Sequence, residues 1–204
     1  MVFYTITEED VEKARSYVPS VEKMEFVKAV ADKCFDTLDI TASNGNNTNA
    51  LPSSYKVNTE RRSRYLMAAF VGLYLQKDYE LDDKDADPWL MSIREYDMYA
   101  GGHIFEVMNK MKSAAKTRDK AYAILSDYSE LKFRLDSDIN GLLTAMNDSA
   151  SRVLAYIEAA SSPAEMKKAM EEVTANKELL DEYLAERKDI MEKAIEEPAD
   201  GDEE

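Results

Sequence analysis

The sequence is short of the residues on which most catalytic and disulfide-linked proteins depend. Its 204 residues include one cysteine, Cys34, and one histidine, His103. A single cysteine cannot form an internal disulfide, and a serine or cysteine nucleophile would have to use His103 as its base. Because nothing near His103 resembles a nucleophile motif, we expect a partly buried, hydrogen-bonded histidine and predict that the protein is not an enzyme.

Motifs for metals and cofactors are missing as well. One histidine cannot supply the two Glu-x-x-His motifs of a di-iron bundle, and the chain has no glycine-rich phosphate loop. Asp83, Asp85 and Asp87 match three ligand positions of an EF-hand loop, but Pro88 replaces its glycine and Arg94 its final glutamate. We therefore predict no metal site, no cofactor and no catalytic residue. Weak cation binding at the three aspartates is the alternative to a solvated acidic linker.

Long apolar runs are absent. The longest extends over 11 residues from Tyr65 to Leu75, whereas a membrane-spanning helix needs about 20. The first residues carry no basic segment before Glu8, and no secretory signal is visible. We therefore expect a buried core helix at Tyr65–Leu75, no membrane association and a cytoplasmic location.

Basic residues are few relative to acids, with 26 Lys and Arg against 41 Asp and Glu and a net charge of −15. Repulsion between this charge and phosphates disfavours direct nucleic-acid binding. Arg61, Arg62 and Arg64 form a dense basic patch, which is a candidate anion or partner contact. The alternative is that these arginines form salt bridges with acids of the same chain. Acids also dominate residues 196–204, for which we expect a disordered acidic tail.

Glycine and proline are scarce, with 6 and 5 residues, and this composition favours helices. Capping residues precede apolar residues spaced in steps of three and four. This pattern predicts helices from Thr7 to about Val18, from Ser20 to Leu38, from Thr59 to Leu75, from Ile93 to about Ala115 with a kink or an interruption at Gly101–Gly102, from Thr117 to Met146 with a stutter or a break near Asp136, and from Ser149 to Ala160.

One segment shows no helical pattern. The asparagine-rich residues 39–58 read as a long exposed loop. We therefore predict an all-α protein, with a helical bundle over residues 1–115 that contains this loop. Residues 116–195 are expected to form a long helical hairpin or coiled coil.

The clearest pattern is a heptad seam in the last predicted helix. Seven of its nine positions are apolar, in the order Met166, Met170, Val173, Lys177, Leu180, Leu184, Arg187, Met191 and Ala194. A repeat of 3.5 residues keeps one stripe of a helix against a partner helix. Leu180, Leu184 and Met191, with Lys177 and Arg187 selecting register, are therefore candidate partner contacts. The alternative is an intramolecular hairpin with the helix that begins near Arg118.

Two stretches carry a resemblance to a known class of proteins. Residues from Arg64 to Leu75 and from Tyr96 to His103 resemble small acidic helical proteins encoded in prophages of Gram-positive bacteria. The resemblance implies a role in virion assembly or host takeover, and it implies no functional residues.

Together these patterns predict a non-enzymatic helical protein-interaction or assembly protein. It would bind a protein partner, or itself, through the C-terminal helix. One alternative is an acidic inhibitor that mimics nucleic acid and binds a basic nucleic-acid-processing protein. Another is an enzyme with carboxylate or metal-assisted chemistry.

Overall fold

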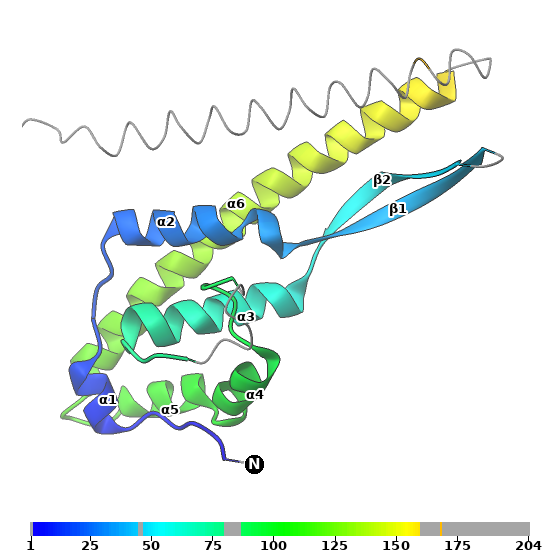
Figure 1. Ribbon diagram of the computed structural model, residues 1–204. Helices are drawn as coiled ribbons and strands as arrows, with labels where there is room; N and C mark the ends of the chain where they lie inside the picture. The colour runs from blue at the N-terminus through cyan, green and yellow to red at the C-terminus, as the bar shows by residue number, and fades with distance from the viewer. Residues whose placement is uncertain (1, 45–46, 80–86, 160–167, 169–204) are drawn as a thin grey trace, which may run out of the picture. The chain divides into compact units, whose positions relative to one another are not determined.

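The computed structural model describes residues 2–44, 47–79, 87–159 and 168 (Figure 1). Helices dominate them, joined by a short 3-10 turn at Asp32–Cys34 and a π turn at Phe70–Tyr74. The elements are α1 (Glu8–Lys13), α2 (Ser20–Val30), β1 (Phe35–Asn44), β2 (Asn47–Val57), α3 (Thr59–Ala69), α4 (Ile93–Gly101), α5 (Ile104–Met111) and α6 (Arg118–Ala159).

The chain divides into two compact units. The first comprises Met1–Asp39 and Tyr55–Met146, and the second comprises Ile40–Ser54 and Asn147–Glu204. The N-terminal part of α6 therefore belongs to the same unit as α1 to α5, although it follows the predicted boundary at residues 115 and 116. The main hydrophobic core and the candidate site lie in the first unit.

The segment predicted as a loop contains two paired strands, so the all-α expectation is corrected. β1 and β2 form a two-stranded sheet, and the two residues between them are too few for a parallel connection. Thr37, Ile40 and Thr41 are β-branched and favour strands, and Asn44-Gly45 is a strong hairpin signal. The prediction of a mostly helical protein is confirmed, but the loop prediction gave the polar asparagines too much weight.

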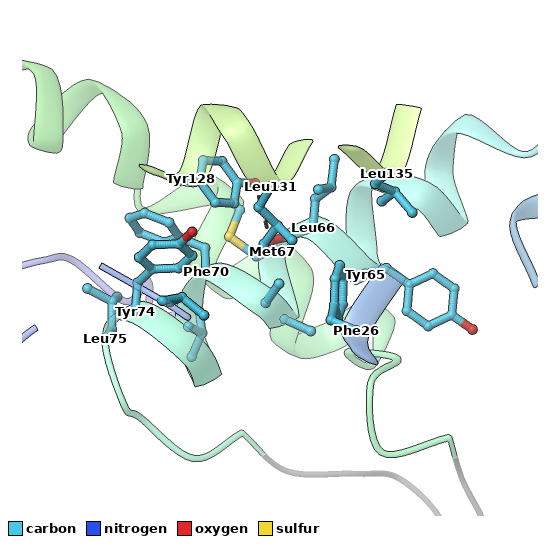
Figure 2. Close-up of a cluster of buried hydrophobic side chains, with 14 of the residues drawn as sticks. Phe26, Tyr65, Leu66, Met67, Phe70, Tyr74, Leu75, Tyr128, Leu131 and Leu135 are labelled. Atoms are coloured by element: carbon cyan, nitrogen blue, oxygen red, sulfur yellow. Dashed lines mark hydrogen bonds between the residues drawn. The ribbon is translucent and has the colours of Figure 1, made fainter. Parts of the chain in front are cut away.

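The predicted core helix at Tyr65–Leu75 is confirmed. All but Gly72 and Leu73 of these residues are buried, in the C-terminal half of α3 and the π turn that follows. Their side chains pack against Phe26 of α2 and against Tyr128, Leu131 and Leu135 of α6 (Figure 2). Each large apolar side chain buried in this way contributes roughly 1.5 to 3 kcal/mol of transfer free energy.

Helix α1 is shorter than predicted. A capping box starts it, since the Thr7 hydroxyl accepts from the Asp10 amide at 3.2 Å and the Asp10 carboxylate accepts from the Thr7 amide at 2.9 Å. The helix ends at Lys13 rather than near Val18. The reason is tertiary: the Arg15 amide leaves the helical pattern and donates to the Tyr74 carbonyl oxygen at 2.8 Å.

Helix α6 is longer than predicted. It is continuous from Arg118 to Ala159, which agrees with a stutter near Asp136 and contradicts the alternative of a break there. The separate helix expected at Ser149–Ala160 is wrong, because these residues up to Ala159 belong to α6. Two consecutive steps of four in the apolar stripe rotate it only slightly around the helix. Leu135 and Ile139 remain buried, at 0% and 2% exposure, so packing holds the helix through this point.

The predicted interruption at Gly101–Gly102 is confirmed, because α4 ends at Gly101 and α5 begins at Ile104. The N-terminal segment lies against this junction. The Tyr4 amide donates to the Met98 carbonyl oxygen at 3.1 Å, and the Tyr4 ring stacks on Tyr99 at 4.6 Å. A side chain at Gly102 would collide with the Tyr4 carbonyl group. Glycine at this position therefore permits the N-terminal segment to dock.

None of the helices in the described part of the chain combines the length and the apolar character that crossing a membrane requires.

We predict opposite effects for two glycine substitutions. Gly102→Ala should displace the N-terminal segment and lower the free energy of unfolding by about 1 to 3 kcal/mol, as overpacking does. Gly141→Ala should raise it by about 0.5 to 1 kcal/mol, because Gly141 lies inside α6 with open space around it. Urea denaturation of the two variants tests both signs, and equal effects would contradict the close approach at Gly102.

Candidate functional site

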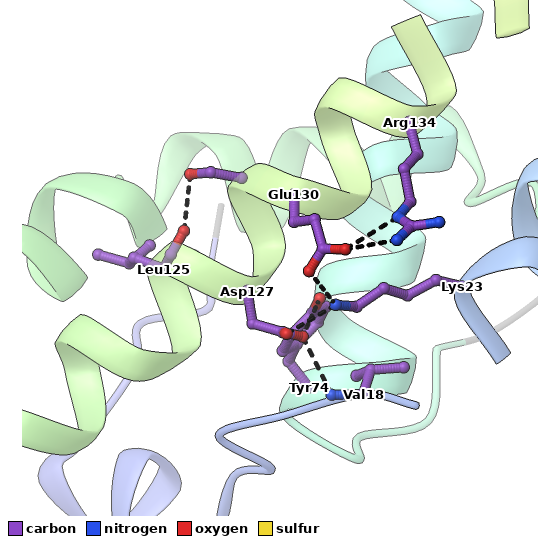
Figure 3. A network of polar contacts seen from close by, with 8 residues as sticks. Val18, Lys23, Tyr74, Leu125, Asp127, Glu130 and Arg134 are labelled. Carbon is purple, nitrogen blue, oxygen red and sulfur yellow. Dashed lines mark hydrogen bonds and ion pairs between the residues drawn. The ribbon is translucent and has the colours of Figure 1, made fainter. Parts of the chain in front are cut away.

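A buried cluster of charged residues joins three parts of the first unit (Figure 3). The Lys23 ammonium group donates to Asp127 at 2.6 Å and to Glu130 at 2.9 Å, and the Lys23 side chain is 0% exposed. Asp127 also accepts from the Tyr74 hydroxyl at 2.9 Å and from the Val18 amide at 3.0 Å. The cluster therefore connects Val18, helix α2, the π turn and helix α6.

The electrostatics of this cluster favour a structural role. Burial alone would lower the pKa of Lys23, but its hydrogen bonds with Asp127 and Glu130 outweigh burial and raise the pKa. Lys23 therefore stays protonated and paired. Neither Lys23 nor Asp127 lines either of the two main pockets that the described residues form. The contacts of the cluster therefore position helices.

The three arginines of the predicted basic patch contact the protein itself. Arg61 donates to the carbonyl oxygens of Lys33 and Phe35 at 2.8 and 3.1 Å. The Arg62 guanidinium pairs with Asp136 on α6, with nitrogen to oxygen distances of 2.6 and 2.5 Å.

The Nε group of Arg64 donates to the Met91 carbonyl oxygen at 2.7 Å. The salt-bridge alternative that the sequence left open therefore describes Arg62 and also Arg61, whose guanidinium lies 3.5 Å from an Asp36 carboxylate oxygen, whereas Arg64 binds a backbone oxygen. An anion or partner contact through these residues stays a prediction.

Other predicted contacts lie outside the described residues. These are the seam positions Lys177, Leu180, Leu184, Arg187 and Met191, and also Asp83 and Asp85 of the acidic linker.

The third aspartate of the linker is part of the fold. Asp87 accepts from Lys33 at 2.5 Å, from the Tyr65 hydroxyl at 3.0 Å and from the Trp89 amide at 3.0 Å. Burial alone would raise the pKa of Asp87, but these hydrogen bonds, led by that from Lys33, lower it. Among the described residues, no group of three or more His, Cys, Asp and Glu side chains is placed to hold a metal ion.

The single histidine and the single cysteine lie in contrasting environments. His103 is 68% exposed, not partly buried as expected, because it precedes α5 with a left-handed backbone (φ of 52°). Its Nδ1 lies 3.5 Å from a Glu106 oxygen. Cys34 is fully buried and donates to the Val30 carbonyl oxygen at 3.2 Å, and burial raises the pKa of its thiol to about 11. The thiol is therefore neutral and inaccessible to substrates.

The most promising site is an open groove of about 420 Å³ on the first unit. Helices α3, α4, α5 and α6 all contribute to its lining. Its apolar residues include Leu66, Met67, Tyr96, Phe105 and Tyr128, and its charged residues are Arg62, Lys112 and Lys132. A volume of this size falls within the range of ligand-binding pockets.

Packed aromatic rings support the floor of the groove. The Tyr128 ring lies 5.0 Å from Phe70, 5.8 Å from Tyr74 and 5.4 Å from Phe105, so four aromatic rings pack as one cluster. Figure 2 shows Phe70, Tyr74 and Tyr128 gathered beside Met67. The Tyr128 hydroxyl donates to the Leu66 carbonyl oxygen at 3.2 Å. Aromatic packing and this hydrogen bond therefore support the floor of the groove.

Exposed aromatic side chains continue the groove along α6. Tyr122 is 54% exposed and Phe133 is 72% exposed. They are eleven residues apart, which is close to three helical turns, so they share one face of α6 about 16 Å apart. Leu125 and Ser129 lie between them on that face and line the groove.

The positions of two aromatic residues in the sequence are a signal for this surface, and the sequence-based predictions did not use it. The buried stripe of α6 runs through Ala121, Ile124, Tyr128, Leu131 and Leu135. Tyr122 and Phe133 are large aromatic residues outside that stripe, and a helical projection would have placed them on the solvent side. The groove beside them could not be found in this way, because four separate helices form it.

A second pocket of about 430 Å³ is lined by Gly72, Gln76, Lys77, Asp78, Tyr79 and Pro88. Two of its lining residues, Tyr79 and Pro88, flank in sequence the residues 80–86, which lie outside the described part of the chain. It has no exposed aromatic rim comparable with Tyr122 and Phe133 among its described neighbours. The groove on α6 is therefore the stronger candidate.

Comparison of the chain with known protein families, with curated proteins and with solved structures finds no match in any of the three. The case for a function therefore rests on the groove and its surroundings.

We predict that the buried charge cluster is essential for folding. Asp127→Ala should lower the free energy of unfolding by about 3 to 5 kcal/mol, because it leaves the Lys23 charge buried without its closest partner. Tyr74→Phe should cost only about 1 kcal/mol, the loss of one hydrogen bond. Lys13→Ala, which removes a fully exposed pair with Glu9, serves as the control and should have little effect. Urea denaturation measures all three, and an Asp127→Ala loss as small as that of the control would refute the cluster's role.

We also predict that stability falls in alkali. Burial raises the pKa of Tyr99 to about 12, and burial likewise raises the pKa of Tyr74 and Tyr128. The unfolded chain loses these phenolic protons from about pH 10, so the contribution is complete below pH 10 and is lost as pH rises towards 12. The raised pKa of Lys23 acts in the same direction. Urea midpoints from pH 8 to 11 should therefore decrease above pH 10, and a flat profile would disagree.

Proposed function

We propose that the chain is a non-enzymatic helical protein-interaction protein. The observation that supports this most directly is the exposed aromatic pair on α6, Tyr122 and Phe133, beside the groove on the same face. Scattered apolar residues are normal on protein surfaces, but here two aromatic side chains adjoin a groove with an aromatic floor. Such a continuous surface is typical of a binding site for another polypeptide.

The energetic argument concerns Phe133. Burying a phenylalanine side chain that starts 72% exposed would contribute roughly 1.5 to 3 kcal/mol. Aromatic anchors that fill a pocket often dominate the affinity of an interface. The packed aromatic rings beneath the groove would add to affinity, because a surface that is already packed loses little conformational entropy on binding.

The C-terminal seam belongs to the same proposal as a second contact surface. Its residues lie outside the described part of the chain, so its support comes from the heptad pattern alone. Leu180 and Leu184 would bind either a partner helix or a second copy of the chain. A dimer by light scattering that becomes a monomer with Leu180→Asp and Leu184→Asp would assign self-association to the seam.

The test of the α6 surface is a peptide selection. A random peptide library displayed on phage is selected against the full chain, and the enriched peptides are then measured by fluorescence anisotropy. We expect Phe133→Ser to weaken their binding about tenfold or more, which corresponds to about 1.4 kcal/mol. The melting temperature should stay nearly unchanged, because exposed side chains contribute little to stability.

The matched control is Val21→Ser, which removes an exposed apolar side chain on α2, away from the groove lining. It should leave peptide binding unchanged. The proposal would be rejected if the selection returned no binding peptide, or if Phe133→Ser and Val21→Ser affected binding equally.

A further inference from the structure

We infer that the groove binds an acidic, amphipathic segment of another protein. In this arrangement, carboxylates of the partner pair with Lys112 and Lys132, and its apolar side chains contact Tyr96 and Phe105. The inference rests on the proposed function and adds the chemistry of the partner to it. It concerns residues that no sequence motif singled out.

The first argument is the sign of the charge in the groove. Its lining includes Arg62, Lys112 and Lys132 and contains no aspartate or glutamate. The whole chain, by contrast, has 41 acids against 26 basic residues. A groove that is purely cationic on a strongly acidic protein differs in local potential from its surroundings, and charge complementarity selects partners of opposite sign.

The second argument is which of these charges are already compensated. Arg62 pairs with Asp136 at 2.5 Å, so its charge is largely neutralised within the fold. Lys132 has no ion pair with any described residue. Lys112 lies 5.1 Å from the centre of the Tyr122 ring and has no acidic partner in the described part of the chain either. No acid of the described residues therefore competes with an incoming carboxylate for the two lysines.

Neighbouring cations outside the groove behave differently. Arg134, two residues after Lys132 on α6, pairs with Glu130 at 2.7 Å. Lys116, four residues after Lys112, pairs with Glu12. Acids among the described residues thus reach cations close to the groove, and none of these acids pairs with Lys112 or Lys132.

The third argument explains why the partner needs both acids and apolar groups. Tyr96 and Phe105 are half-buried and line the groove with Leu66 and Met67, so a purely polar anion would leave this apolar surface wet. A segment with carboxylates on either side of an apolar side chain would pair with the lysines through its carboxylates and cover the aromatic rings with its apolar side chain. Recognition of an amphipathic segment by a groove with charged flanks is a common mode of peptide binding.

A short acidic segment suits this protein better than a nucleic acid does. Screening at physiological salt limits exposed charge interactions to about 8 Å, so two local lysines can attract a few carboxylates. A nucleic acid carries a phosphate every few ångströms, and its phosphates beyond the groove would meet the remaining negative surface. The net charge of −15 therefore disfavours the longer polyanion.

The test uses two labelled peptides of twelve residues with identical Leu and Phe positions. The first peptide carries Glu at alternate polar positions, and the second peptide carries Lys at the same positions. We expect the full chain to bind the Glu peptide at least about tenfold more tightly than the Lys peptide by fluorescence anisotropy. The double variant Lys112→Glu with Lys132→Glu should reverse this preference.

The matched control is Lys28→Glu with Lys56→Glu, which changes the net charge equally at two lysines that do not line the groove. It should alter the Glu-peptide affinity by less than about twofold, because distant surface charges are screened. An equal loss in both double variants would overturn the inference, since net charge alone would then control binding. Tighter binding of a single-stranded DNA of twelve nucleotides would overturn it too.

Two further outcomes separate this inference from the proposed function. If both peptides bind equally and Phe133→Ser weakens both, the interaction surface stands and the acidic partner is wrong. If neither peptide binds and the earlier selection also fails, both proposals are wrong. A third result would show that a second copy of the chain occupies the groove. In that case the Glu peptide would bind less as the protein concentration rises, the mass of the protein by light scattering would double, and the inference would be overturned.

Discussion

The carboxylate of Asp127 accepts hydrogen bonds from three groups that are distant in sequence, the Val18 amide, the Lys23 ammonium group and the Tyr74 hydroxyl. Lys23 is fully excluded from solvent, and an unpaired buried ammonium group would be strongly unfavourable. The ion pair therefore fixes the rotation of α6 about its own axis relative to α2 and the π turn. This rotation decides which side chains of α6 in the first unit face the core, the groove and solvent.

Once this rotation is set, α6 presents three different surfaces. Ile124, Leu131 and Leu135 lie in the core. Leu125, Tyr128 and Lys132 line the groove, and Tyr128 is shared between the groove and the aromatic cluster beneath it. Tyr122 and Phe133 face solvent. A core ion pair and an aromatic cluster thus determine where the exposed aromatic side chains and the lysines of the groove are placed, which is how the fold positions the proposed interaction surface.

The predictions that succeeded depended on local chemistry. The capping residues Thr7 and Ser92 start helices, Gly101–Gly102 separates α4 from α5, and the apolar run from Tyr65 to Leu75 is the central core segment. Each of these depends on neighbouring residues and on helical spacing. One error arose where two local signals in the same segment favoured different structures. Residues 39–58 had both loop and hairpin signals, and the hairpin formed because strand pairing satisfies backbone groups that an exposed loop leaves to water.

Other errors arose where distant residues decide. Nothing near Lys13 shows that α1 must end there, because the cause is a hydrogen bond between Arg15 and Tyr74, far along the chain. Arg61, Arg62 and Arg64 look like a free basic patch in sequence, yet their partners include Asp136 and Met91. The groove is the clearest case, since its residues come from four helices and no spacing rule connects them.

The sequence by itself determined the acidic character, the predominance of helix, the main capping sites and the buried central segment. These follow from composition and from the period of the helix, which act over a few residues. Tertiary structure alone decided the end of α1, the continuation of α6 beyond Met146, the partners of the three arginines and the placement of Lys112 and Lys132 around an aromatic floor. The physical reason is that burial and ion pairing act between residues that are close in space, and the order of residues along the chain does not reveal that closeness until the chain is folded.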